Sequence, residues 1–399
     1  MTPAPAPALL PAAVGVTLGA QALVVLASLA LSVTAALVLP ALGLPKAAVG
    51  WYAAALFVAS AAATLVTPQL VAGLGPVRLH QAMLLLAGLG LLALALGHVA
   101  ALAASALLIG LAYGPANPAS SALLARLSPP HLRNRVFSIK QIAVPLGGAT
   151  AGLLLPALAA GLGWQAALAL LGGVLLAAML AIAPWRRKLD AGFLQPGGPA
   201  QPLWLPFAVL REGGPALRLG ATALSFACVQ FTYSAFVPTL LVSVAGWSLA
   251  GAGLVLTVGL AVSVAARLVL GWVADRVAPP LVLGALGVVM AAACLAGMGL
   301  GPGTPSWLAL LVAGVLGFAA FGWNGICLAE TARLAPPGRV AAATSGTMMM
   351  VYAGACLGPA LFGAALAATG GPVAGLVLLA LFGLAPLAWL RREAPQPTG

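Results

Sequence analysis

Two basic residues, Lys140 and Arg267, lie inside apolar stretches of about 20 residues or more, the length that crosses a bilayer as a helix. Ionisable groups at such positions are costly in free energy and usually serve function. Arg267 precedes Arg276 by nine residues, about 13 Å along a helix and so close to the middle of the span. Its guanidinium could hold a carboxylate through two parallel hydrogen bonds. The alternative is a structural arginine that bonds backbone carbonyls.

Lys140 lies about 9 Å along a helix from the basic segment that holds Arg133 and Arg135. At that depth its ammonium group could attract an anion into the span. It could equally extend to the lipid headgroups at the end of the helix. The sequence leaves both interpretations open.

Acidic residues are scarcer still: of the five, Asp275 is the last residue of a predicted span and only Glu330 falls further inside one. Because Arg333 follows one turn later, an ion pair with Arg333 or Arg339 competes with a role for Glu330 in proton coupling. The first six spans contain no carboxylate, which disfavours proton coupling through an acid there. If the protein moves a solute across the membrane, coupling of that movement to protons would then depend on a protonated substrate, on exchange of one solute for another, or on Glu330.

Uncharged polar and aromatic side chains within the spans could orient a small molecule in an otherwise apolar cavity. Hydrogen bonding between helices is the alternative for each of them. These candidates are Gln21, Tyr113, Asn117, Gln141, Gln230, Tyr233, Trp323, Asn324 and Tyr352. The sequence holds no phosphate-binding loop, no Ser/His/Asp set and no metal-ligand spacing, so we expect no catalytic residue, no metal and no cofactor.

The overall composition identifies the solvent in which these residues work. Of 399 residues 63% are hydrophobic and only 6% are charged, against about a quarter in soluble domains. A soluble enzyme is therefore nearly excluded, and the partner of the chain is the lipid bilayer. Turn signals divide the sequence into twelve apolar spans of an all-α membrane protein. They cover residues 13–40, 47–72, 78–98, 101–127, 134–160, 163–185, 217–243, 248–275, 279–300, 306–333, 339–368 and 371–391.

The positive charges are distributed unevenly among the connections between these spans. With both termini cytoplasmic, the inner connections and ends hold 14 of the 17 cations, and the outer connections hold only Lys46. This asymmetry predicts that orientation in the inner membrane, and it explains the net charge of +12 without nucleic acid. The longest connection is basic and rich in proline and glycine. It predicts an N-terminal half at 1–185, a cytoplasmic linker at 186–215 and a C-terminal half at 216–399.

The two halves repeat each other at a spacing of 207 residues. Asn117 recurs as Asn324, and the segment Ala-Arg-Leu-Ser-Pro-Pro at 125–130 recurs with one difference at 332–337. At the same spacing Lys140 corresponds to Thr347, which is uncharged. Two parallel six-helix halves form the repeat architecture of many transporters, with the substrate site between them.

Two motifs resemble those of the major facilitator superfamily. Residues 271–276 read Gly-Trp-Val-Ala-Asp-Arg and are similar to its Gly-x-x-x-Asp-Arg loop signature, whereas the loop after the second span keeps only Arg78. Gly354, Gly358 and Pro359 resemble its Gly-Pro interface motif. The resemblance implies that Asp275 latches neighbouring helices in one conformation, although a solvated surface pair with Arg276 is the simpler alternative. The residues expected to govern conformational change are Gly271, Asp275, Arg276, Glu330, Arg333, Gly354, Gly358 and Pro359.

The surroundings of the two buried cations resemble those of anion carriers within this superfamily. Ala266-Arg267 followed by Gly271 is similar to the eighth-helix arginine pattern of monocarboxylate transporters, and residues 138–147 are similar to bacterial carriers of cyanate and other anions. The resemblance implies that Lys140 and Arg267 face one cavity. We therefore expect a monomeric secondary transporter for a small organic anion, such as a monocarboxylate. The alternatives are an exporter of apolar or drug-like molecules and a non-transporting membrane sensor.

Overall fold

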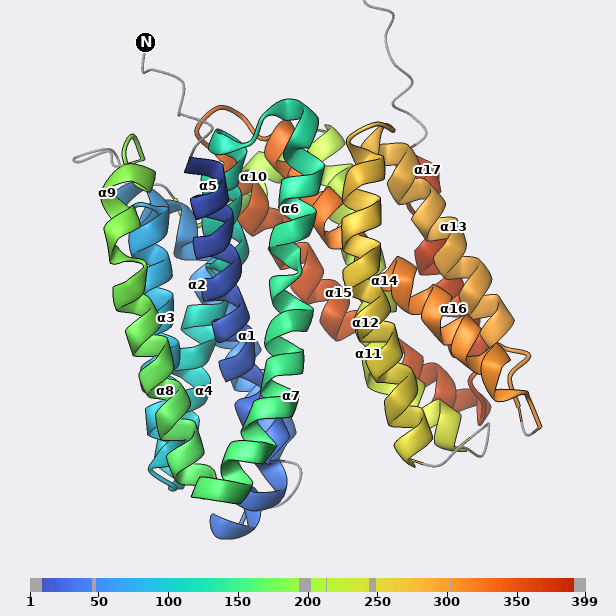
Figure 1. Cartoon of the computed structure of the whole chain (residues 1–399). Helices are drawn as coiled ribbons and strands as arrows, with labels where there is room; N and C mark the ends of the chain where they lie inside the picture. The colour runs from blue at the N-terminus through green and yellow to red at the C-terminus, as the bar shows by residue number, and fades with distance from the viewer. Residues whose placement is uncertain are drawn as a thin grey trace, which may run out of the picture. The chain divides into compact units, whose positions relative to one another are not determined.

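The computed structural model of the chain describes residues 9–44, 48–193, 202–212, 214–243, 249–301 and 303–390. Lys46, Arg391 and Arg392, which belong to the charge pattern, lie outside the described residues. All secondary structure in the described ranges is helical (Figure 1). The elements are α1 (Leu10–Ala41), α2 (Ala48–Leu74), α3 (Pro76–Ala95), α4 (Val99–Tyr113), α5 (Ala116–Leu127), η2 (Pro130–Leu132), α6 (Arg133–Gln141), α7 (Ala143–Leu162), α8 (Trp164–Ala181), η3 (Ala183–Trp185), α9 (Arg186–Leu189), α10 (Leu205–Glu212), α11 (Gly214–Ser243), α12 (Leu249–Ala274), α13 (Pro279–Gly297), α14 (Ser306–Leu334), α15 (Val340–Thr369), α16 (Val373–Leu384) and α17 (Leu387–Leu390).

The long helices follow the predicted spans in order. Within the described residues, ten helical spans are long and apolar enough to cross a membrane, and Ala261–Ala274 and Val373–Leu384 are shorter apolar helices. The structure differs from the prediction where proline interrupts a span. The fourth predicted span is divided into α4 and α5, and the fifth into α6 and α7.

The chain forms two compact units that combine the sequence halves in an unexpected way. Unit 1 comprises Met1–Ser128, Lys140–Val209 and Ala335–Gly346, and unit 2 comprises Pro129–Ile139, Leu210–Leu334 and Thr347–Gly399. Each unit thus takes a short segment from the other half of the sequence, the start of α15 in unit 1 and most of α6 in unit 2. The predicted division at 185 and 216 stays a prediction.

In unit 1, α1 packs on α7, α2 on α4, and α3 on both α4 and α8. In unit 2, α14 contacts α11, α12 and α13, and α13 also packs on α16. The two units use glycine at matching places. A Cβ atom on Gly147 of α7 would clash with the carbonyl oxygen of Ala22, and one on Gly354 of α15 would clash with that of Leu224. Only glycine permits this approach of two backbones, which the repeat predicts for both halves.

The break between α4 and α5 is stabilised by side chains of the neighbouring helix. Pro118 has no N–H to offer the carbonyl of Gly114, and the Thr64 hydroxyl on α2 donates to that oxygen at 3.0 Å. Ser60, one turn earlier on α2, donates to the carbonyl of Gly110 at 3.1 Å. In the same way Pro145 deprives the carbonyl of Gln141 of its helical donor, at the boundary of α6 and α7. Both breaks lie beside residues that the sequence singles out for binding.

Candidate functional site

A buried polar cluster forms at these breaks in unit 1. Lys140, which is only 1% exposed, donates from Nζ to Asn117 Oδ1 at 2.7 Å and to Gln141 Oε1 at 3.2 Å. Gln21 of α1 donates from Nε2 to the same Asn117 oxygen at 3.5 Å, while its Oε1 is buried without a hydrogen-bond partner. The structure therefore brings four of the predicted binding residues, Lys140, Asn117, Gln141 and Gln21, into one hydrogen-bonded cluster.

The acceptors around Lys140 are all neutral. Asp190 is the only acid in unit 1, and its carboxylate accepts the backbone N–H groups of Val77 at 2.7 Å and Arg78 at 3.2 Å, at the start of α3. His80, fully buried on α3, contacts the Pro76 carbonyl through Nδ1 at 2.7 Å and the Ser120 hydroxyl through Nε2 at 3.1 Å. Nothing in the described part of the unit offers Lys140 a counter-charge.

Arg267 is a second buried cation without a carboxylate partner among the described residues. It is 2% exposed on α12, and Nη1 donates to the Ser263 hydroxyl at 2.8 Å and the Ser263 carbonyl at 3.2 Å. Its Nε is buried with no hydrogen-bond partner. The serine one turn earlier thus satisfies one edge of the guanidinium and leaves a donor open. A planar cation with an unused donor in an apolar helix suits a carboxylate ligand.

The other predicted binding residues of unit 2 fall into a polar pair and an aromatic group. Asn324 Nδ2 donates to Gln230 Oε1 at 3.0 Å, so each repeat-related asparagine contacts a glutamine of the first long helix in its unit. Tyr233 and Trp323 are 1% exposed and donate to the carbonyls of Ala313 and Ala320, at 3.1 and 2.9 Å. These two side chains therefore have helix partners of their own.

The remaining two aromatic candidates are half-buried. Tyr113 of α4 makes an edge-to-face contact with Phe57 at a centroid distance of 6.3 Å. Tyr352 lies on α15, twelve residues beyond the start of that helix. The binding role of both residues stays a prediction.

The loop signature residue Asp275 joins α12 to the first turn of α6. One carboxylate oxygen accepts the backbone N–H of Asn134 at 3.0 Å, and the other lies 3.5 Å from Nε of Arg135. The side chain of Asn134 donates in turn to the Ala274 carbonyl at 2.9 Å. Burial of the carboxyl group is the largest influence on the pKa of Asp275 and raises it above its ordinary value, against the hydrogen bonds from Asn134 and the charge of Arg135.

Two glycines let α6 approach its neighbours closely at the same point. A Cβ atom on Gly271 of α12 would lie 2.6 Å from Cβ of Ser138, and one on Gly325 of α14 would clash with Cα of Ser138. Arg276 does not contribute to this junction, because its guanidinium stacks on Trp272 at 3.7 Å from the ring centre. Glu330 forms an ion pair with Arg333 through both carboxylate oxygens, one of them at 2.8 Å from Nε, which is the pairing that the sequence allows.

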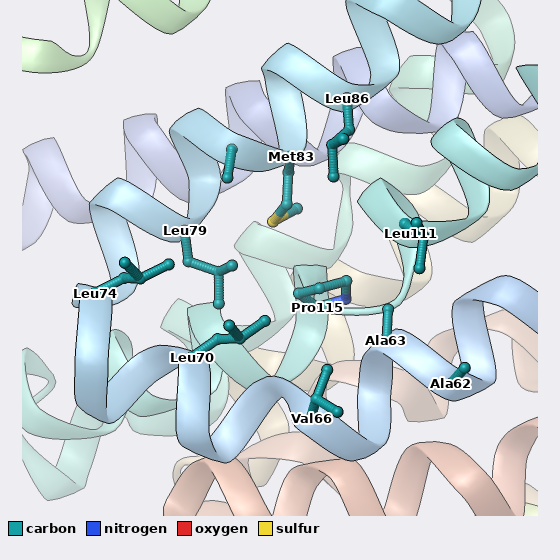
Figure 2. Close-up of a pocket in the computed structure, with 11 residues that line it drawn as sticks. Ala62, Ala63, Val66, Leu70, Leu74, Leu79, Met83, Leu86, Leu111 and Pro115 are labelled. Carbon is teal, nitrogen blue, oxygen red and sulfur yellow. The ribbon is translucent and has the colours of Figure 1, made fainter.

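An apolar cavity of about 380 Å³ lies between α2, α3 and the junction of α4 and α5 (Figure 2). Its lining includes Leu70, Leu79, Met83 and Pro115, and no charged or amide side chain contributes to it. Because a charged ligand would find no partner there, this cavity is not a candidate anion site.

The comparisons with known proteins decide the family. A family model described as Major Facilitator Superfamily matches residues 17–359 of the chain. The chain belongs to the Major Facilitator Superfamily. Its members are transporters, so the protein is a secondary active transporter and a multi-pass membrane protein, and not an enzyme.

Solved structures support the same fold. The E. coli fucose:proton symporter FucP is 14% identical, with a TM-score of 0.76 and coverage of 96% of this chain and 98% of that one. The human organic anion transporter MFSD10 is 17% identical, with a TM-score of 0.73 and coverage of 94% and 98%. The proton:xylose symporter XylE is 15% identical, with a TM-score of 0.67 and coverage of 97% and 96%. At these identities the similarity shows the fold alone. No curated protein sequence matches the chain.

Several residues that contact the candidate residues in the structure were not singled out from the sequence. Ser263 was detectable, because a serine four residues before a buried arginine lies on the same helix face. Asn134 and Gly325 carried no comparable signal, because their importance depends on which helices meet. Asp190 falls within the predicted linker at 186–215, and the structure shows that it caps the start of α3.

Proposed function

We propose that this member of the superfamily moves a small organic anion, a monocarboxylate, across the inner membrane by alternating access. The observation that carries the proposal is the pair of buried cations, Lys140 and Arg267, neither of which contacts a carboxylate among the described residues. An unpaired buried charge is destabilising unless a ligand supplies the opposite charge. A transported anion supplies that charge.

In this proposal the two cations have different tasks. Arg267 binds the carboxylate, because its planar guanidinium keeps a donor unused beyond Ser263. Lys140 supplies the second positive charge, and Asn117, Gln141 and Gln21 orient the part of the substrate next to it. Further binding residues of the proposal are Gln230, Asn324, Tyr113, Tyr233, Trp323 and Tyr352.

The gating residues of the proposal are those at the α12–α6 junction. Asp275 fastens the start of α6 to α12, and Gly271 allows the contact with Ser138 that accompanies it. Glu330 and Arg333 pair within α14, and Gly354 and Gly358 of α15 pack closely on the carbonyl oxygens of Leu224 and Cys228 of α11. We propose that these contacts, together with Pro359, keep the helices intact during the change of conformation.

The experiment is a ligand screen followed by transport. Purified protein is heated with sodium pyruvate or sodium lactate, with sodium chloride at equal ionic strength, and with sugars and apolar drugs. Uptake of radiolabelled pyruvate and lactate is then measured in proteoliposomes. We expect a raised melting temperature with the carboxylates, and uptake that Arg267→Ala reduces to the level of empty vesicles.

Arg187→Ala is the matched control, because it also removes one positive charge but from an exposed position. Pyruvate and lactate uptake that persists in Arg267→Ala would disprove the role of this arginine. A thermal shift with drugs alone would favour an exporter of drug-like molecules. Absence of flux for every compound would favour a membrane sensor.

A further inference from the structure

We propose that Lys140 is the proton-binding residue of the transport cycle, and that it takes up one proton together with the transported anion and releases both on the other side of the membrane. This inference rests on the proposed function. It addresses a gap in the sequence, because the spans of unit 1 have no carboxylate that could carry a proton.

The hydrogen bonds of Lys140 fit a neutral amine when no anion is bound. The amine has two hydrogens, and Nζ has two acceptors, Asn117 Oδ1 at 2.7 Å and Gln141 Oε1 at 3.2 Å. An ammonium group has a third hydrogen. That hydrogen has no hydrogen-bond partner among the described residues, and the side chain is 1% exposed, so water does not supply one freely. A buried ammonium is costly in this setting, whereas the amine is fully satisfied.

A bound carboxylate reverses this preference. It offers both the missing acceptor and the missing negative charge, so the amine binds a proton as the anion arrives. The balance is Lys–NH2 plus H⁺ plus RCOO⁻ giving Lys–NH3⁺ paired with RCOO⁻. One proton and one anion enter the site together, and the lysine returns to the amine when both leave. The cycle therefore moves no net charge.

The side chains around Lys140 leave it as the residue that can bind and release the proton. His80 on α3 is a titratable group on which the charge of Lys140 acts, and both of its ring nitrogens already have partners in Pro76 and Ser120. The helices α1 and α5 bring only the amides of Gln21 and Asn117. Arg267 keeps its proton at all accessible pH values, so it provides a constant charge and cannot couple. Thr347, at the equivalent place in the second half, cannot titrate.

The test counts protons as an anion binds. Purified full-length protein is titrated calorimetrically at pH 8 with sodium pyruvate and with sodium lactate, in Tris and in triethanolamine. The two buffers differ in their enthalpy of protonation, so the difference in heat gives the number of protons taken up. We expect uptake approaching one proton for each anion bound in the wild-type protein. Above the pH at which the amine predominates, the anion affinity should fall about tenfold per pH unit by linkage.

Lys140→Arg keeps the positive charge at this position but cannot bind or release a proton, because arginine stays charged. We expect this variant to bind pyruvate or lactate with no proton uptake and with an affinity that does not change between pH 7 and 9. Lys188→Arg, at an exposed position, and His80→Gln should both take up as many protons per bound anion as the wild-type protein.

The outcomes distinguish the two proposals. Anion binding by the wild-type protein without proton uptake would overturn the role of Lys140 and leave the proposed function intact. Proton uptake on anion binding that persists in Lys140→Arg, or that disappears in His80→Gln, would also overturn the role of Lys140. Failure of the wild-type protein to bind either anion would overturn the proposed function and this inference with it.

Discussion

Charged side chains of this transporter are few, and three acids near helix ends have definite partners. Asp190 caps α3, Asp275 accepts the N–H group of Asn134, and Glu330 pairs with Arg333. Lys140 and Arg267 differ because their acceptors are amides, a hydroxyl and a carbonyl. This contrast between paired acids and cations with neutral partners is what singles out Lys140 and Arg267 as the proposed binding residues at the scale of a single side chain.

Asp275 allows a pH-dependent prediction at this scale. Burial raises its pKa in the folded protein above the unfolded value of 3.8, so between these two values the native state binds more protons than the unfolded state. The contribution of Asp275 to stability is therefore complete below the unfolded pKa and is lost as the pH rises through the folded one. In Asp275→Asn the side chain does not titrate, and the amide oxygen can still accept from Asn134.

We accordingly expect the melting temperature of wild type minus that of Asp275→Asn to decrease as the pH rises from 4 to 7. The measurement is a thermal melt of both proteins in detergent across this range. Glu212→Gln, which changes an exposed acid, is the control. A difference that stays constant, or that increases with pH, would show that burial does not dominate at this carboxyl group.

Helix pairs in the two units approach closely at glycines, and the repeat predicts where. Gly147 faces Ala22 in unit 1, and Gly354 faces Leu224 in unit 2, each with room for hydrogen only. By contrast, a Cβ atom added to Gly152 in α7 would meet no neighbouring atom within 4 Å. Close packing is therefore a property of particular glycines and not of every glycine in the motif.

A pair of substitutions tests this at the scale of the element. In Gly354→Val the new side chain meets the carbonyl of Leu224 on α11, so α11 and α15 must separate. We expect a loss of about 1–3 kcal/mol in stability, the range found for overpacked cores. Gly152→Val adds the same atoms to α7, another long helix, at an exposed position. We expect little change in stability for this variant. Thermal melts in detergent compare the two, and equal melting temperatures would contradict the packing argument.

The sequence predicts the helices of this protein better than their contacts. Apolar runs and turn residues locate the spans because lipid requires each span to satisfy its own backbone. The interruptions at Pro118 and Pro145 follow from the missing N–H groups, although the spans were expected to be continuous there. The junction of Asp275 with Asn134 could not be derived, since it depends on which helix ends meet across 141 residues of chain. The same holds for Lys140 and Asn117, which are 23 residues apart.

At the scale of the whole molecule, orientation in the membrane decides on which side the proposed gate lies. The charge pattern predicts cytoplasmic termini, because 14 cations fall on one set of connections and only Lys46 on the other. In that orientation the junction of Asp275 with α6 lies on the cytoplasmic side. A junction that fastens in one state and opens in the other would then control access from the cytoplasm.

Cysteine labelling tests this orientation directly. Cys228, Cys294 and Cys327 are buried, so Cys356→Ser removes the exposed thiol and leaves a background variant whose cysteines are all buried. Into this background we introduce Ser306→Cys, at the predicted outer end of the span 306–333, or Lys188→Cys, in the predicted cytoplasmic linker; both positions are exposed. A membrane-impermeant maleimide should label Ser306→Cys in intact cells and Lys188→Cys only after the cells are permeabilised. The reverse pattern would place the junction at Asp275 on the outer side, and the direction assigned to the gate would have to be inverted.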